Sequence, residues 1–135
     1  MDIFEELYAI ERECFGDSWT SEMLREEWEN PLSVTVAHRE GGRLAAFALG
    51  RVVADEGELY QIGTLCEFRR RGIAEKMLAE LHDKMRGKGA AVCFLEVRSR
   101  NVSAIALYEK CGYKRISVRK SYYPDDDAVI MRKKL

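Results

Sequence analysis

The sequence predicts a single α/β domain in which helices pack on a mixed, mostly antiparallel sheet. Its first half places two segments of helical period before three short apolar segments, whereas its second half alternates strand and helix periods. Strand–helix–strand connections imply right-handed crossovers and therefore a partly parallel sheet. A length of 135 residues suits one domain, so we expect residues 1–135 to fold as one unit.

Two amphipathic helices should come first. Apolar residues recur at helical spacing from Ile3 to Cys14, with charged residues between them. The Gly-Asp-Ser segment at 16–18 breaks this pattern, and Thr20 or Ser21 can cap a second helix. This helix should end before the first proline, because the residue that precedes a proline disfavours helical backbone.

An antiparallel meander should follow the two helices. Strands are expected at 34–37, 44–53 and 58–65. Paired glycines at 41–42 match a hairpin turn between the first two strands, and the Asp-Glu-Gly turn at 55–57 leads into the third.

The second half should alternate helices and strands. The first helix has one apolar face, and the strand after it is apolar throughout, which is typical of a strand buried on both faces. The expected elements are a helix at 73–87, a strand at 91–95, a helix that Asn101 or Ser103 begins and Gly112 closes, and strands at about 113–121 and 128–133.

The composition excludes several classes of function. A formal net charge of −1 creates no global field that would draw the chain to nucleic acid or to an anionic membrane. No apolar run reaches the roughly 20 residues that a membrane-spanning helix needs, and the acidic N-terminus lacks the features of a signal peptide. We therefore expect a cytoplasmic protein with neither membrane nor direct nucleic-acid partners.

The cysteines predict neither a disulfide framework nor a metal site. Their spacing matches no zinc signature, and only His38 and His82 could join them as ligands. We expect them to be small, buried apolar residues, and we expect no bound metal. The four residues are Cys14, Cys66, Cys93 and Cys111.

A basic, glycine-containing segment lies between an expected strand and an expected helix. Gly72 and the small Ala74 let a ligand approach the backbone, and the helix N-terminus offers unpaired N–H groups. The segment therefore favours a pyrophosphate site, although a solvated basic helix start explains it equally well when it is taken alone. Its residues are Arg69, Arg70, Arg71, Gly72, Ile73 and Ala74.

Two motifs together are typical of one enzyme family. Arg69, Gly72 and Ala74 fill the fixed places of an R/Q-x-x-G-x-G/A motif that follows a strand. After the next expected strand come Asn101 and an A-x-x-L-Y-x-x-x-G-F/Y helix at 104–113. In both motifs the chain resembles the GNAT family of N-acetyltransferases.

Within that family the chain is most similar to the RimI-type ribosomal-protein alanine N-acetyltransferases. The similarity covers nearly the whole chain and includes the Tyr-Tyr-Pro segment at 122–124. Three places depart from the usual pattern: Cys66 replaces a proline, Gly63-Thr64 replaces Ala-Val, and Ala74 stands for a glycine. All of these leave backbone contacts to a cofactor possible.

The resemblance implies a sheet that splays between its fourth and fifth strands, those ending near Leu65 and Val97. It also implies that acetyl-CoA lodges in the gap as co-substrate, with its pantetheine on one strand and its pyrophosphate at the helix N-terminus. The implied cofactor-binding residues are Ile62, Gly63, Thr64, Arg69, Arg70, Arg71, Gly72, Ile73, Ala74, Glu75 and Asn101.

Two residues match the positions of the family's proton-transfer groups. Attack of an amine on a thioester needs a base for the amine proton and benefits from an acid at the leaving thiolate. Glu96 is the expected base, since an ionised carboxylate in an apolar strand is costly without a role or a partner. Its alternative role is a salt bridge to Arg98. Tyr108 is the expected acid, and its alternative role is an amphipathic anchor in the core.

The implied acceptor is the N-terminal α-amine of a protein, namely a ribosomal protein that begins with alanine. The 15–19 loop, Tyr122 and Tyr123 match regions that hold the peptide in similar enzymes. The acidic residues 125–127 could attract a basic peptide or form a solvated turn. Acetylation of a small free amine and a non-catalytic CoA- or ribosome-binding module stay open as alternatives. The sequence leaves the oligomeric state open and favours a monomer.

Overall fold

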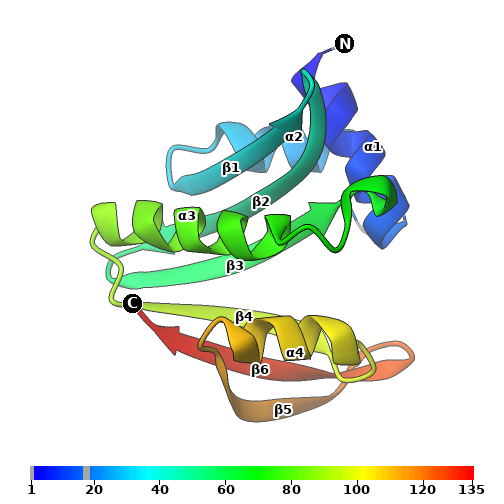
Figure 1. Ribbon diagram of the computed structural model, residues 1–135. Coiled ribbons are helices and arrows are strands. Elements are labelled where there is room, and N and C mark those ends of the chain that lie inside the picture. The colour runs from blue at the N-terminus through cyan, green and yellow to red at the C-terminus, as the bar shows by residue number, and fades with distance from the viewer. Residues whose placement is uncertain (1, 17–18) are drawn as a thin grey trace.

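The computed structural model describes residues 2–16 and 19–135, and these form four α-helices, a short 3-10 helix and six strands (Figure 1). In chain order the elements are α1 (Ile3–Phe15), α2 (Ser21–Glu29), β1 (Ser33–Glu40), β2 (Arg43–Val53), β3 (Glu56–Thr64), η1 (Cys66–Phe68), α3 (Ile73–Gly87), β4 (Val92–Arg98), α4 (Val102–Lys110), β5 (Lys114–Tyr123) and β6 (Asp126–Lys134).

All six strands belong to one sheet, in the order β1-β2-β3-β4-β6-β5. The β3–β4 pair, which α3 connects, is parallel, and the other neighbouring pairs are antiparallel. The predicted mixed, mostly antiparallel sheet flanked by helices is therefore confirmed.

Helices cover both faces of the sheet (Figure 1). α1 and α2 lie against β1, β2 and β3, where Leu7 and Leu24 pack around Phe47. α3 and α4 lie on the opposite face, and the predicted apolar face of α3 is buried there through Ile73, Met77, Leu78, Leu81 and Met85. None of the described helices is long and apolar enough to span a membrane.

The helix starts follow the predicted caps. Thr20 Oγ1 accepts a hydrogen bond from the backbone N–H of Met23 at 3.1 Å, so Thr20 rather than Ser21 caps α2. Asn101 Oδ1 accepts from the Ala104 N–H at 3.2 Å, so Asn101 rather than Ser103 caps α4. Residues 17–18 of the predicted break after α1 lie outside the described residues.

Burial of β4 differs from the prediction. Cys93, Leu95 and Val97 are buried against α3 and α4, but Phe94 and Glu96 on the other face are only half-buried. α1 and α2 end over β3, so this face of β4 is left partly open. The prediction of a strand buried on both faces was therefore wrong.

The cysteines also differ among themselves. Cys93 is buried and Cys14 and Cys111 are half-buried, but Cys66 is exposed in the short η1 helix. The prediction of four buried cysteines was wrong for Cys66, because η1 lies outside the sheet and buries none of its residues.

The sheet splays between β3 and β4. These strands pair at only three positions, which end with Glu58 opposite Phe94, whereas β4 pairs with β6 along its whole length. The opening lies between the strands that were expected to splay. They are the third and fourth strands of the described chain rather than the fourth and fifth, because only three strands precede β4.

A β-bulge marks the same point of β3. Gly50 of β2 faces Leu59 and the neighbouring Leu49 faces Gln61, so Tyr60 is an extra residue on β3. A bulge increases the local twist and changes which side chains point to each face. Gly50 is required here, since a Cβ atom at this position would lie 2.5 Å from the carbonyl oxygen of Glu58.

A buried polar chain connects α3 to the second half of the sheet. His82 Nε2 lies 2.6 Å from the hydroxyl of Tyr113, which donates a hydrogen bond to Cys93 Sγ at 3.2 Å. Burial, together with the positive charges of Lys133 and Arg86, lowers the pKa of His82 to about 4. His82 is therefore neutral in the folded protein at neutral pH.

This burial predicts a loss of stability in mild acid. The folded-state pKa of His82 lies below its unfolded value, so its contribution is present above about pH 6.5 and is lost as the pH falls towards about 4. The free energy of unfolding should drop by about 2 kcal/mol between pH 7 and pH 5 on account of His82 alone. Urea unfolding of His82→Gln should show a smaller drop than the wild type, whereas His38→Gln should not. Equal drops in the wild type and His82→Gln would contradict this assignment.

Candidate active site

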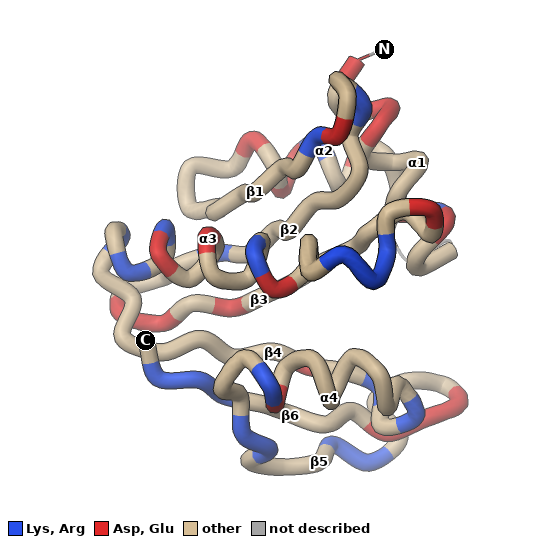
Figure 2. The backbone as a smooth tube through the Cα atoms, viewed as in Figure 1, with Lys and Arg blue, Asp and Glu red and all other residues tan. Residues whose placement is uncertain are grey.

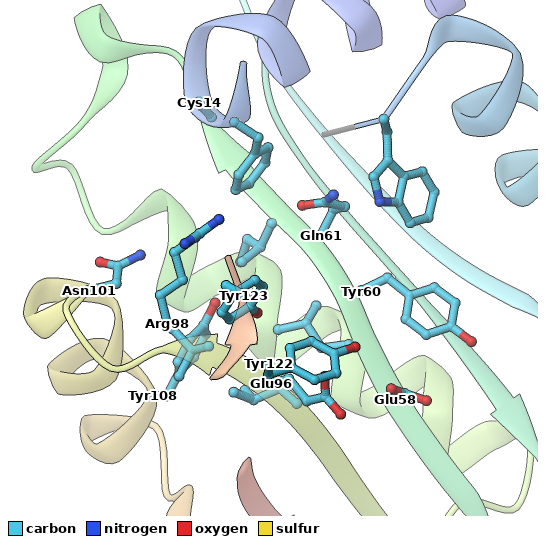
Figure 3. A pocket seen from close by; sticks show the side chains of 16 residues that line it. Cys14, Glu58, Tyr60, Gln61, Glu96, Arg98, Asn101, Tyr108, Tyr122 and Tyr123 are labelled. Atoms are coloured by element: carbon cyan, nitrogen blue, oxygen red, sulfur yellow. The ribbon is translucent and has the colours of Figure 1, made fainter. Parts of the chain in front are cut away.

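The opening between β3 and β4 forms a pocket of about 680 Å³ (Figure 3). Residues of β3 and β4 form its walls, and α1, α4 and the end of β5 close it. The predicted catalytic pair, Glu96 and Tyr108, line it together, as do the predicted ligand residues Ile62, Asn101 and Tyr122. The fold thus brings residues far apart in the sequence into one cavity.

The two candidate catalytic side chains enter the pocket from opposite faces of the sheet. Leu95 and Val97 of β4 point into the core under α3 and α4, so Glu96 between them points to the face that carries α1 and α2. Tyr108 belongs to α4 and comes from the other face. In Figure 3 Tyr108 and Asn101 lie on one side of the cavity and Glu96 and Glu58 on the other.

Glu96 is held by neighbours on β5. Its side chain is 25% exposed, and Oε1 accepts a hydrogen bond from Arg119 Nη1 at 3.1 Å. A second hydrogen bond, from Tyr122 to Glu96, raises the pKa of the Tyr122 phenol. The expected alternative pairing with Arg98 was wrong, because Arg98 instead pairs with Asp125 and lies over the Tyr123 ring.

Tyr108 is buried at the other side of the pocket. Only 8% of the residue is exposed, and burial raises the pKa of its phenol to about 12. Its ring meets that of Tyr113 edge-on, at 5.8 Å between centroids. Tyr108 therefore packs in the core and also presents a protonated hydroxyl to the cavity at neutral pH.

The end of β3 offers backbone to the opening. Ile62, Gly63 and Thr64 pair with β2 along one edge, and the other edge lies beyond the last β3–β4 pair. Backbone groups on that second edge face the pocket instead of a strand. The Thr64 carbonyl accepts two hydrogen bonds from residues outside β3. Arg69 Nε donates to it at 2.9 Å and Cys14 Sγ at 3.4 Å. Arg69 thus has a structural contact in this segment.

The N-terminus of α3 has the features of an anion site. Gly72 has φ +75° and supplies no capping side chain, and the first helical bond runs from the Lys76 N–H to the Gly72 carbonyl. The N–H groups of Ile73, Ala74 and Glu75 therefore have no partner inside the helix. A Cβ atom at Gly72 would have no atom within 4 Å, so the space beside these donors is open.

The other residues of the basic segment lie around this helix start. Arg70 adopts φ +65°, which is uncommon for a residue other than glycine. Arg71 donates to the carbonyl of Glu67 at 3.5 Å and lies over the Phe68 ring. Glu75 forms an ion pair with Lys110 of α4 at 2.8 Å, which links the two helices across the splay.

The acidic hairpin between β5 and β6 is largely structural. Asp126 accepts from the Arg100 N–H at 3.0 Å and Asp127 from the Ser121 N–H at 2.8 Å, while Asp125 pairs with Arg98. Of the two expectations for residues 125–127, the structure favours a turn held by local contacts.

Several pocket residues were not predicted from the sequence. Among them, Tyr60 occupies the bulge and Glu58 lies at the last β3–β4 pair, whereas Tyr123, expected beside Tyr122, lines the pocket from the end of β5. Partial burial raises the pKa of Glu58, and the negative charge of Glu96 raises it further. An acidic residue in an expected strand was a signal for Glu58, but the bulge at Tyr60 has no signature in the sequence.

The described residues contain no group of three or more His, Cys, Asp or Glu side chains that could hold a metal ion. The pocket itself presents the Glu96 carboxylate, the Tyr108 phenol and exposed backbone.

Comparison with known proteins identifies the family. Residues 4–113 match the model of the acetyltransferase (GNAT) family. The chain is 34% identical over 129 residues to the [ribosomal protein bS18]-alanine N-acetyltransferase of Escherichia coli (strain K12), a match that covers 92% of this chain and 86% of that one.

Solved structures agree. The crystal structure of the ribosomal-protein-S18-alanine N-acetyltransferase from Escherichia coli superposes with a TM-score of 0.90 at 31% identity, covering 97% of this chain and 86% of the other. The fold is also shared with the PaiA N-acetyltransferase from Thermoplasma acidophilum, solved in complex with coenzyme A, at 21% identity and a TM-score of 0.79 over 98% and 92% of the two chains. The predicted family resemblance is confirmed: the chain belongs to the acetyltransferase (GNAT) family.

Proposed function

We propose that this N-acetyltransferase moves the acetyl group of acetyl-CoA to the N-terminal α-amine of a protein in the cytoplasm, with a ribosomal protein that begins with alanine as its acceptor. The observation that carries the proposal is the pocket between β3 and β4, which holds a carboxylate from one face and a phenol from the other. The relatives that act on ribosomal protein S18 match this chain over nearly its whole length, which supports the same acceptor.

Acetyl-CoA fits the open edge of β3 and the N-terminus of α3. The open edge of β3 at Ile62, Gly63 and Thr64 can hydrogen-bond the pantetheine as a neighbouring strand would. The three unpaired N–H groups at the start of α3 suit the pyrophosphate, with Arg70 and Arg71 nearby as counter-charges. Asn101 Oδ1 is used in the helix cap, so its amide NH₂ is the group left for the cofactor.

The acceptor amine must approach from the α1–α2 side, because Glu96 points there. A neutral α-amine forms the new N–C bond with the thioester carbonyl, and Glu96 takes the proton that the nitrogen loses. The C–S bond then breaks, and the Tyr108 hydroxyl donates to the departing sulfur from the opposite face. Arg119 and Tyr122 hold the Glu96 carboxylate in position.

The acceptor class can be tested directly. We expect thiol release from acetyl-CoA in the presence of peptides with an N-terminal alanine, and mass spectrometry should locate the acetyl group on the α-amine. The same peptides with a blocked N-terminus but a free lysine side chain serve as controls and should not react. Turnover of free amines alone, such as polyamines or amino acids, would contradict the proposal.

The proton-transfer roles predict large kinetic effects. Glu96→Gln and Tyr108→Phe should each lower kcat by about 10²–10⁴-fold, because each removes a group that exchanges a proton or hydrogen bond with the reacting atoms. Coenzyme A affinity, measured by calorimetry, should change little and reports intact folding. A variant with near-normal kcat would remove its residue from the mechanism.

The pyrophosphate site predicts a loss of cofactor affinity without a loss of fold. In Gly72→Val the added side chain would fill the open space beside the α3 N–H groups, so coenzyme A binding should weaken by more than about tenfold in calorimetry. Gly89→Val is a matched control, since Gly89 also has positive φ and open space but lies at the far end of α3. Both variants should lose similar stability. Equal coenzyme A affinity in the two variants would place the pyrophosphate elsewhere.

A further inference from the structure

Glu58 differs from the other charged residues of the pocket in having no partner. Among the described residues nothing forms an ion pair with it within 4.0 Å, and none donates a hydrogen bond to its carboxylate. The two arginines whose charges reach Glu58 are already paired. Arg51 binds both carboxylate oxygens of Glu27 at 2.8 and 3.0 Å, and Arg119 binds Glu96 at 3.1 Å.

Glu58 lies beside Glu96 on the acceptor side of the sheet. It pairs with Phe94 across the parallel β3–β4 contact, so its side chain shares the face of Phe94 and of Glu96 two residues further on. Figure 3 shows Glu58 and Glu96 on the same side of the cavity. The negative charge of Glu96 helps to raise the pKa of Glu58, which agrees with this closeness.

Glu58 is an exposed residue that lines the pocket, so its unpaired carboxylate is free to bind a cation that the acceptor brings. The reacting amine cannot be that cation, because it must be neutral to attack the thioester and a second carboxylate would favour its protonated form. We therefore expect the acceptor to offer Glu58 a positive charge from another group close to the amine. Consecutive Cα atoms are about 3.8 Å apart, so in a peptide the second side chain is the nearest candidate beyond the first residue.

We propose that Glu58 binds the basic side chain of the acceptor's second residue, and that the enzyme consequently prefers N-termini with Arg or Lys at this position. The inference rests on the proposed N-terminal acetylation. It gives Glu58 of β3 a part in the enzyme's choice of acceptor. An arginine guanidinium suits the site well, because its fork can bind both oxygens of one carboxylate.

The test compares two peptides that differ only at the second residue, Ala-Arg and Ala-Gln, in otherwise identical sequences. For the wild type, kcat/KM should be about 3- to 10-fold higher for the Ala-Arg peptide. In Glu58→Gln this ratio should fall to about one, and in Glu58→Lys an Ala-Glu peptide should become the better substrate. Glu56→Gln is the matched control, since Glu56 is an exposed carboxylate of the same strand outside the pocket, and it should keep the wild-type ratio.

The outcomes separate this inference from the proposed function. If no alanine peptide is acetylated, the proposed function fails. If the peptides are acetylated but the wild type does not discriminate between them, or Glu58→Gln keeps the preference, Glu58 does not bind the second residue. Coenzyme A binding by the Glu58 variants reports folding, so a misfolded variant would not be mistaken for a loss of specificity.

Discussion

The structure depends on how early β3 and β4 stop pairing. Three residue pairs hold the two halves of the sheet together, and beyond Glu58 and Phe94 the strands separate. Unpaired backbone in a protein interior is costly, so such an opening persists only if water or a ligand satisfies it. The bulge at Tyr60, which Gly50 makes sterically possible, sets in at the same place and turns the rest of β3 away from β4. The open edge of β3 and the pocket beside it both follow from the early end of the β3–β4 pairing.

The opening also presents different side chains on its two faces. Because side chains alternate across a strand, Leu95 and Val97 close the core beneath α3 and α4 while Glu96 faces the layer of α1 and α2. In the proposed reaction, a cofactor held at the start of α3 and an acceptor near Glu96 would approach the gap from opposite faces and meet there. Their binding would displace water from both sides and so strengthen the electrostatic contacts of the Glu96 and Tyr108 side chains.

The sequence predicted the elements better than their surroundings. Hydrophobic period and capping residues sufficed for α3 and α4, because these depend on local spacing and on caps such as Asn101. The motifs also identified Glu96 and Tyr108, and both side chains line the same pocket. Burial of β4 and the partner of Glu96 could not be predicted, since they depend on where α1 and α2 end and on which arginine of β5 lies across the sheet. Glu58 was missed for the same reason: its lack of a partner is a property of the assembled pocket.

The environment of Tyr108 limits the kind of help it gives to the leaving group. Its phenol, with a pKa raised to about 12, is a weaker acid by about a thousandfold or more than a thiol with a pKa near 8.5. Complete proton transfer from Tyr108 to a free thiolate would therefore be uphill. A hydrogen bond that strengthens as charge develops on the sulfur needs no such transfer, and it acts in a buried site where charge-assisted bonds are strong. Burial that keeps Tyr108 protonated and fixed in the core thus favours stabilisation of the departing thiolate by a rigid donor, with the proton following as the sulfur becomes solvated.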